Sequence, residues 1–185
     1  MNDHCKLAAY DQTGNARIAP LLGRGFQYDI EIVDAFGEVI QRGREFNRIP
    51  QVGLDFVANL LLGETTPIST WYCGLFEGNY VPVSSTTAAD LPGSAQESTV
   101  YSQTARPSWQ GVYDGIQLIT NTASRAEFTF TSAKTIYGGF LISTSDKGSN
   151  TGTLMSIARF ENPREVPANT TFRLGITLTL LAASS

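Results

Sequence analysis

The feature that most constrains this chain is a strict two-residue alternation near its C-terminal end. Between Thr171 and Leu181, apolar side chains occupy every second position, and mostly threonine and arginine stand between them. Successive side chains of a β-strand point to opposite faces, so this pattern predicts a strand with one buried face. Residues 26–32 alternate in the same way and lead into a turn at 34–37, which predicts a hairpin whose return strand covers about 38–46. Both segments favour a mainly β fold.

The rest of the chain predicts more strands and one helix. Residues 47–63 change to a helical period and end at Gly63, so we expect one short helix at about 50–62 that covers an end or a face of a sheet. Strand patterns separated by turn residues are typical of a sandwich or barrel. The further strands are expected at 69–76, 113–119, 126–131, 135–144 and 153–160.

These elements predict a two-part organisation. Residues 1–25 show no sustained period and are expected to form an extended N-terminal arm, and residues 26–185 a single domain. The expected fold class is mainly β, an antiparallel β-sandwich of jelly-roll-like type with one short helix. A long polar segment between about 77 and 108 is expected to be a loop that makes contacts with a partner.

Composition narrows the class of protein. The chain has 185 residues, a formal net charge of -4 and only 16% charged residues. It therefore lacks the basic footprint of a nucleic-acid-binding protein. No apolar run approaches the roughly 20 residues of a membrane span, and the N-terminus lacks the apolar core of a signal peptide. We expect neither nucleic acid nor membrane as a partner.

The sequence offers little for catalysis. His4 is the single histidine and lies in the arm, where a catalytic triad would lack the packing that fixes its geometry. Cys5 and Cys73 do not form a metal or redox motif, and Cys73 is expected to be a core residue in a strand. Gly138 and Gly139 fall inside a predicted strand, where close packing explains glycine. We expect no enzyme activity and no catalytic, cofactor or metal site.

Four aromatic residues leave a carbohydrate-binding alternative open. Trp71, Tyr72, Trp109 and Tyr113 are candidates for a sugar-stacking platform, and scattered acids allow a carboxylate pair without nominating one. Alternation, however, places Trp71 and Tyr72 on opposite faces of a strand, so at least one of them is expected to be a core residue.

A series of short motifs, in order along the chain, resembles a family of virion proteins of tailed bacteriophages. The resemblance covers about residues 26–180, including an opening hairpin that leads to Asn47 and Gly53-Leu54-Asp55. The motifs are Trp71-Tyr72-Cys73-Gly74-Leu75-Phe76, Ala88-Ala89-Asp90, Glu97 with Tyr101-Ser102-Gln103-Thr104-Ala105-Arg106-Pro107, Ala126-Glu127-Phe128-Thr129-Phe130, Tyr137-Gly138-Gly139-Phe140-Leu141-Ile142-Ser143-Thr144, Lys147-Gly148-Ser149-Asn150-Thr151-Gly152-Thr153-Leu154 and Ala158-Arg159-Phe160. The chain departs from the family pattern at Gly93-Ser94-Ala95-Gln96, where a glycine-tryptophan pair is usual.

The resemblance implies a non-enzymatic structural protein of the virion, most of all a capsid cement or decoration protein. Such proteins are β-sandwich or jelly-roll folds that bind the major capsid protein between capsomers, often as dimers or trimers. The implied location is the exterior of the capsid, after assembly in the host cytoplasm. A tail, baseplate or fibre-associated module is the alternative within the same class.

Overall fold

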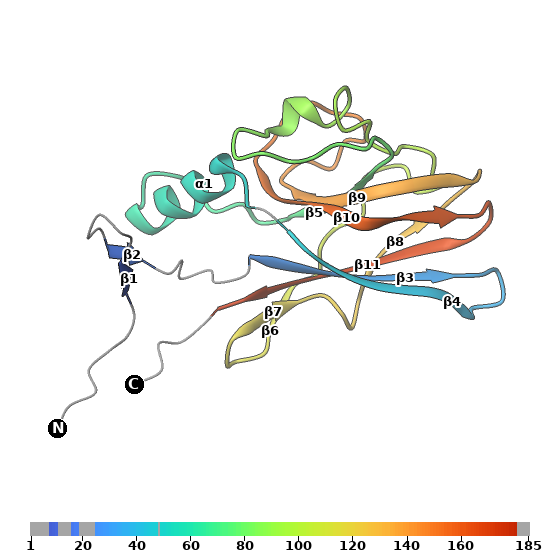
Figure 1. Ribbon diagram of the computed structural model, residues 1–185, viewed down its shortest axis with the longest axis horizontal. Helices are drawn as coiled ribbons and strands as arrows, with labels where there is room; N and C mark the ends of the chain where they lie inside the picture. The colour runs from blue at the N-terminus through green and yellow to red at the C-terminus, as the bar shows by residue number, and fades with distance from the viewer. Residues whose placement is uncertain (1–7, 11–15, 19–24, 48, 181–185) are drawn as a thin grey trace.

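A computed structural model describes residues 8–10, 16–18, 25–47 and 49–180, and in it two antiparallel sheets lie face to face with one helix at their end (Figure 1). The mainly β class and the sandwich-like arrangement predicted from the alternation are confirmed.

The larger sheet has six strands with the C-terminal strand in its middle. The strand order is β4-β3-β11-β7-β6, and β8 pairs with β11 beside β7. The strands are β3 (Phe26–Val33), β4 (Val39–Phe46), β6 (Val112–Tyr113), β7 (Leu118–Thr120), β8 (Ala126–Thr129) and β11 (Thr171–Thr179). The alternation that predicted β11 is explained by this place, because its apolar side chains face the second sheet. β11 is not an edge strand, since β3 pairs with it on one side and β7 and β8 pair with it on the other.

The smaller sheet has the order β10-β9-β5. Its strands are β5 (Tyr72–Phe76), β9 (Lys134–Ile142) and β10 (Leu154–Val166). The main hydrophobic core lies between the two sheets and contains Tyr28, Leu75, Phe128, Phe160 and Phe172, all fully buried. The Tyr28 hydroxyl keeps a partner in this core through a 2.7 Å hydrogen bond with Ser156, as buried polar atoms require.

Two of the predicted strands differ most from their expected bounds. The strand expected at 113–119 is a hairpin of β6 and β7, because Asp114 and Gly115 form a turn inside that range. The strand expected at 153–160 continues to Val166 as β10, with a register irregularity between Arg159 and Arg164. Pro163 lies at this irregularity, where the missing amide breaks no ladder hydrogen bond.

The helix α1 (Gln51–Leu62) agrees with its predicted bounds. It ends at Gly63, whose φ of 74° is the left-handed conformation that glycine adopts most easily. Gly53 is its buried residue and lies against the backbone of β10, where an added Cβ would stand 2.7 Å from the Met155 carbonyl oxygen. The helix therefore packs on the sheet by backbone approach, and its far end extends past the strands (Figure 1).

Most of the predicted N-terminal arm lies outside the described residues. Within residues 1–25 the described part consists of Gly25 and two short strands, β1 (Ala8–Tyr10) and β2 (Ala16–Ile18), which pair antiparallel with Ala9 opposite Arg17.

The predicted loop at 77–108 is packed on its own domain. It crosses the outer face of the smaller sheet with a short 3-10 helix, η1 (Ala88–Asp90), and buries Leu91 and Ala95 against Phe140. Gly138 sits below Phe76, where a Cβ would clash with the aromatic ring, so the close packing expected for this glycine is confirmed. The loop is thus a second hydrophobic layer, and its expected role as a partner-binding clamp has no support from this packing.

Candidate interaction surface

Several motif residues meet in a buried polar cluster between the long loop and the turn after β9. The Arg106 guanidinium donates to both oxygens of Glu97, at 2.8 and 2.6 Å, and the two side chains are 0% and 1% exposed. Its Nη1 donates to the Thr144 carbonyl, and Nη2, which also bonds with Glu97, donates to the Ser149 carbonyl. Glu97 also accepts the Gly148 amide at 3.0 Å. The charges are therefore paired and hydrogen-bonded, the condition for burying them.

Lys147 closes the same cluster from the solvent side. Its ammonium donates to the backbone carbonyls of Thr99, Tyr101 and Gln103 and lies 4.0 Å from the centre of the Tyr101 ring. Desolvation lowers its pKa, although the Glu97 charge acts in the opposite direction. Three carbonyls on one ammonium fix the path of the loop over 99–103.

The motif residues that carry the family resemblance thus support the fold. Glu97 and Arg106 lie nine residues apart in the long loop, and the fold brings Lys147 to them from the turn after β9. All three residues belong to the sequence motifs described above, but the motifs do not predict that these side chains lie in one cluster. Because their polar atoms are satisfied inside the molecule, this cluster offers no group for catalysis.

The four aromatic candidates do not form one platform. Trp71 packs into the inter-sheet core and Tyr72 onto the outer layer, as the alternation predicted. Trp109 is partly buried in the same core, and its indole N–H donates to the Ile176 carbonyl at 3.1 Å. Tyr113 is exposed on the β6–β7 hairpin. A sugar-stacking surface made from all four residues is therefore not present.

The other chemical candidates have structural places or lie outside the described residues. Cys73 is fully buried, and desolvation raises the pKa of its thiol, so it is the core residue that the strand pattern predicted. His4 and Cys5 lie outside the described residues. Within residues 25–47 and 49–180 no three histidine, cysteine or acidic side chains gather as metal ligands. No helix among the described residues is long and apolar enough to cross a membrane.

Acidic side chains on the outer face of the six-stranded sheet lie in ion pairs. Glu31 pairs with Arg42 and Arg125, at 3.3 and 3.4 Å, and Asp29 pairs with Arg44 at 2.9 Å. These pairs make a polar, charged surface of alternating sign across β3 and β4. Exposed pairs of this kind contribute little to stability.

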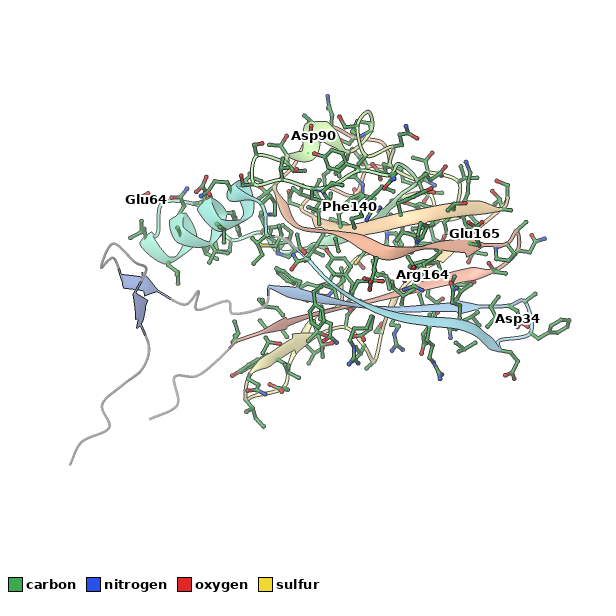
Figure 2. The ribbon with its side chains drawn as sticks, in the orientation of Figure 1. Asp34, Glu64, Asp90, Phe140, Arg164 and Glu165 are labelled. Atoms are coloured by element: carbon green, nitrogen blue, oxygen red, sulfur yellow. The ribbon has the colours of Figure 1, made fainter. Side chains whose placement is uncertain are left out.

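One end of the sandwich is apolar instead. Phe26 at the start of β3 pairs with Leu178 near the end of β11, which pairs with Ile119 of β7, so these strand ends lie together. The helix α1 and the β6–β7 hairpin lie at this end (Figure 1), and Figure 2 places Glu64 here and Asp34 at the opposite end. We call the exposed apolar side chains here the apolar end; they are Phe46, Leu60, Leu61, Leu62, Val112, Tyr113, Ile116 and Leu180.

A pocket of about 200 Å³ opens beside the apolar end. Apolar side chains from both sheets, α1 and the segment around Trp109 line it: Phe26, Ile49, Val57, Trp71, Trp109, Ile119, Leu141, Met155, Leu178 and Leu180. Sequence reasoning missed this surface, although the run Leu60-Leu61-Leu62 at the end of α1 was a signal, because three successive leucines cannot all face one side of a helix.

Comparison of the chain with protein-family models, with curated proteins and with solved structures finds no match.

Proposed function

We propose that the protein is a non-enzymatic structural component of a tailed-bacteriophage particle, a capsid cement or decoration protein that binds the major capsid protein at capsomer junctions on the outside of the head. The ordered motifs supply the class. The apolar end is the single structural observation that supports a protein partner.

The exposure of the apolar end is the reason. Leu61, Leu62 and Ile116 have 83%, 70% and 79% of their surface exposed. Large apolar side chains that are exposed together at one end of a molecule are typical of interaction sites. Burying one leucine side chain contributes about 1.5–3 kcal/mol, so a capsid surface that covers several of these side chains gains useful affinity.

A pre-formed domain suits this role. The Arg106 cluster and the outer hydrophobic layer hold the long loop against the sheet, so binding does not have to order it. Many copies on one shell, each with a moderate contact and associated as dimers or trimers, would reinforce the shell through multivalency.

The test is cosedimentation with purified empty heads that lack this protein. The wild-type chain is expected to pellet with heads and to raise the temperature at which they disassemble. The double variant Leu61→Glu/Leu62→Glu is expected to lose at least about tenfold in affinity, because each buried leucine contributes more than a factor of ten in binding.

Phe36→Glu is the matched control. Phe36 is 92% exposed but lies in the turn at the opposite end, between β3 and β4. It is expected to bind heads like the wild type. If wild-type protein binds neither heads nor tails, the proposal fails; binding to tails alone assigns the protein to the tail or baseplate, and binding to host polysaccharide with no particle binding selects the carbohydrate-binding alternative.

A further inference from the structure

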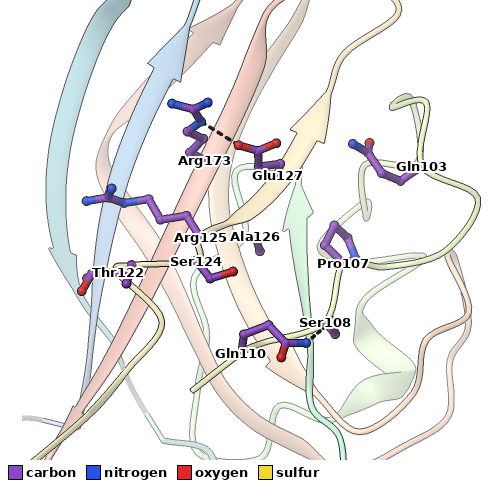
Figure 3. Close-up of a pocket in the computed structure, with 11 residues that line it drawn as sticks. Gln103, Pro107, Ser108, Gln110, Thr122, Ser124, Arg125, Ala126, Glu127 and Arg173 are labelled. Atoms are coloured by element: carbon purple, nitrogen blue, oxygen red, sulfur yellow. Dashed lines mark hydrogen bonds and ion pairs between the residues drawn. The ribbon is translucent and has the colours of Figure 1, made fainter. Parts of the chain in front are cut away.

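A second surface, separate from the apolar end, is a polar groove at one side of the sandwich, between the edges of the two sheets. It has a volume of about 680 Å³. Figure 3 shows it between the segment that carries Pro107, Ser108 and Gln110 on one side and the segment that carries Ser124, Ala126 and Glu127 on the other. The two walls belong to different sheets, because the first segment lies along β5 and the second is β8 with the residues before it.

The backbone of β8 has one side free at Glu127. Phe130 exchanges hydrogen bonds with Thr170 and Asn169 on the β11 side, whereas Thr129 bonds with Ser102 and Gln103 on the opposite side. Backbone groups alternate in direction along a strand, so the N–H and C=O of Glu127 point to the same side as those of Thr129. The segment that contains Ser102 and Gln103 makes its last backbone contact with β8 at Thr129. The backbone N–H and C=O of Glu127 therefore face the groove.

On the opposite wall of the groove, the backbone N–H and C=O of Ser108 are also free of the sheet. The Cys73 amide donates to the Pro107 carbonyl at 2.8 Å, and the Trp109 amide donates to the Trp71 carbonyl at 2.7 Å. Pro107 and Trp109 thus extend the smaller sheet beyond β5, and the N–H and C=O of the residue between them point away from it. Across the described chain, no hydrogen bond outside the sheet ladders uses the amide of Ser108 or of Glu127.

We propose that this groove binds an extended segment of another polypeptide chain, which adds as a strand alongside β8 and faces Ser108 on the other wall. Unpaired strand edges bind extended peptides through main-chain hydrogen bonds. A strand residue occupies roughly 160 Å³, taking about 3.3 Å of rise, 4.8 Å between strands and 10 Å between sheets. The groove therefore has room for about four residues.

The walls define the chemistry of the guest segment. On the inner side stands Ala126, which is small and buried, so the guest places a small side chain there. On the outer side stand the Glu127–Arg173 ion pair, at 2.8 Å, and the amide side chains of Gln103 and Gln110. A short segment that alternates small and polar residues fits, and a run of large apolar residues does not. Because each wall closes one side of the groove, it admits one strand and not a growing sheet.

The probe is a blocked octapeptide of alternating threonine and alanine, added at millimolar concentration to the full chain labelled with 15N. In amide NMR spectra the signals of Glu127 and Ser108 are expected to shift most, and their hydrogen exchange is expected to slow by about tenfold. The same peptide with methyl groups on alternate backbone nitrogens cannot donate the strand hydrogen bonds and is expected to cause no such change.

Two variants at one position separate backbone from side chain. Glu127→Pro removes the amide that faces the groove and leaves the β8–β11 ladder intact, because that amide is not part of the ladder. Glu127→Ala removes the side chain and keeps the amide. We expect Glu127→Ala to bind the peptide within twofold of wild type and Glu127→Pro to lose binding, with both variants folded by their spectra.

Three results would overturn the proposal: no shift at Glu127 and Ser108, equal effects of the methylated and unmethylated peptides, or equal binding by the two variants. Because the readout uses the isolated protein, failure here leaves the capsid proposal standing, and failure to bind heads leaves this groove to be judged on its own.

Discussion

The Arg106 side chain joins the long loop to the turn after β9. Its guanidinium is fully buried and donates to the Glu97 carboxylate from the long loop and to two backbone carbonyls from the turn after β9. Arg106→Ala leaves the Glu97 charge buried without its partner and is expected to lower the free energy of unfolding by about 3–5 kcal/mol. Urea denaturation followed by tryptophan fluorescence measures it.

A surface pair gives the control for this change. Arg42 is largely exposed and pairs with Glu31 at 3.3 Å, and Arg42→Ala is expected to cost less than about 1 kcal/mol. Replacing both buried partners by leucine is expected to cost less than the sum of the two single changes, since neither charge is then left alone. Additive single changes would show that the two charges do not depend on each other.

Asp114 gives the β6–β7 hairpin a pH dependence. Its carboxylate accepts the amides of Leu118, Ile116 and Gln117 at 2.8–2.9 Å, and these hydrogen bonds lower its pKa from the usual 3.8. Because the pKa of Asp114 is lower in the folded state, its charged carboxylate stabilises the hairpin at pH values above the pKa of the unfolded state. This contribution is lost as pH falls through the folded pKa. We therefore expect the protection factors of the three amides, which correct for the intrinsic pH dependence of exchange, to fall below pH 3.8, while those of β11 amides do not change in the same range.

Asp114→Asn tests the cause, because the amide oxygen still accepts hydrogen bonds but does not titrate. The variant is expected to show the same protection factors for these amides at low and neutral pH. A persistent pH step in Asp114→Asn would assign the transition to another group.

The burial of single residues was predictable from the sequence where it followed from alternation. The contacts that a residue makes with distant parts of the chain were not predictable. Cys73 and the opposite faces of Trp71 and Tyr72 follow from a period of two, which one segment contains by itself. The contacts of Arg106 and Glu97 with Thr144, Gly148 and Ser149 depend on how the loop after β5 meets the turn after β9, and no local pattern encodes that meeting.

At the scale of elements, the helix and most strands were predictable, including the short strands β5 and β8, whereas the β6–β7 hairpin and the C-terminal half of β10 were not. The period of α1 and its Gly63 terminus are local signals, as are the apolar alternations of β3 and β11. The single strand predicted at 113–119 was wrong, because β-forming residues flank Asp114-Gly115 on both sides and hide the turn that this dipeptide forms.

Gly53 in α1 is expected to tolerate no side chain. In an exposed helix, alanine is favoured over glycine by up to about 1 kcal/mol. Here the new Cβ would stand 2.7 Å from the Met155 carbonyl oxygen, a backbone atom that cannot rotate away. Gly53→Ala is expected to lower the thermal midpoint, measured by calorimetry.

Gly93→Ala is the matched control, since a Cβ at that position meets nothing within 4 Å. It is expected to leave the midpoint unchanged. A stabilised Gly53→Ala variant would mean that α1 can move away from β10 without loss.

At the scale of the whole molecule, the centre of the larger sheet should be its most protected part. β11 pairs with β3 on one side and with β7 and β8 on the other. Its amides are expected to exchange only through global unfolding, at least about a hundredfold more slowly than those of the short β6–β7 hairpin. Hydrogen–deuterium exchange with mass spectrometry measures the difference; equal rates would contradict a single cooperative sandwich.

The central position of β11 also sets a time order for the synthesis of the protein. Ile32 of β3 pairs with Phe172, 140 residues later in the chain. A ribosome adds about 5–20 residues per second, so β3 waits roughly ten seconds for its partner with its apolar face uncovered. The nascent hairpin of β3 and β4 therefore exists without its central partner strand during that interval, and the larger sheet forms only after β11 has been synthesised.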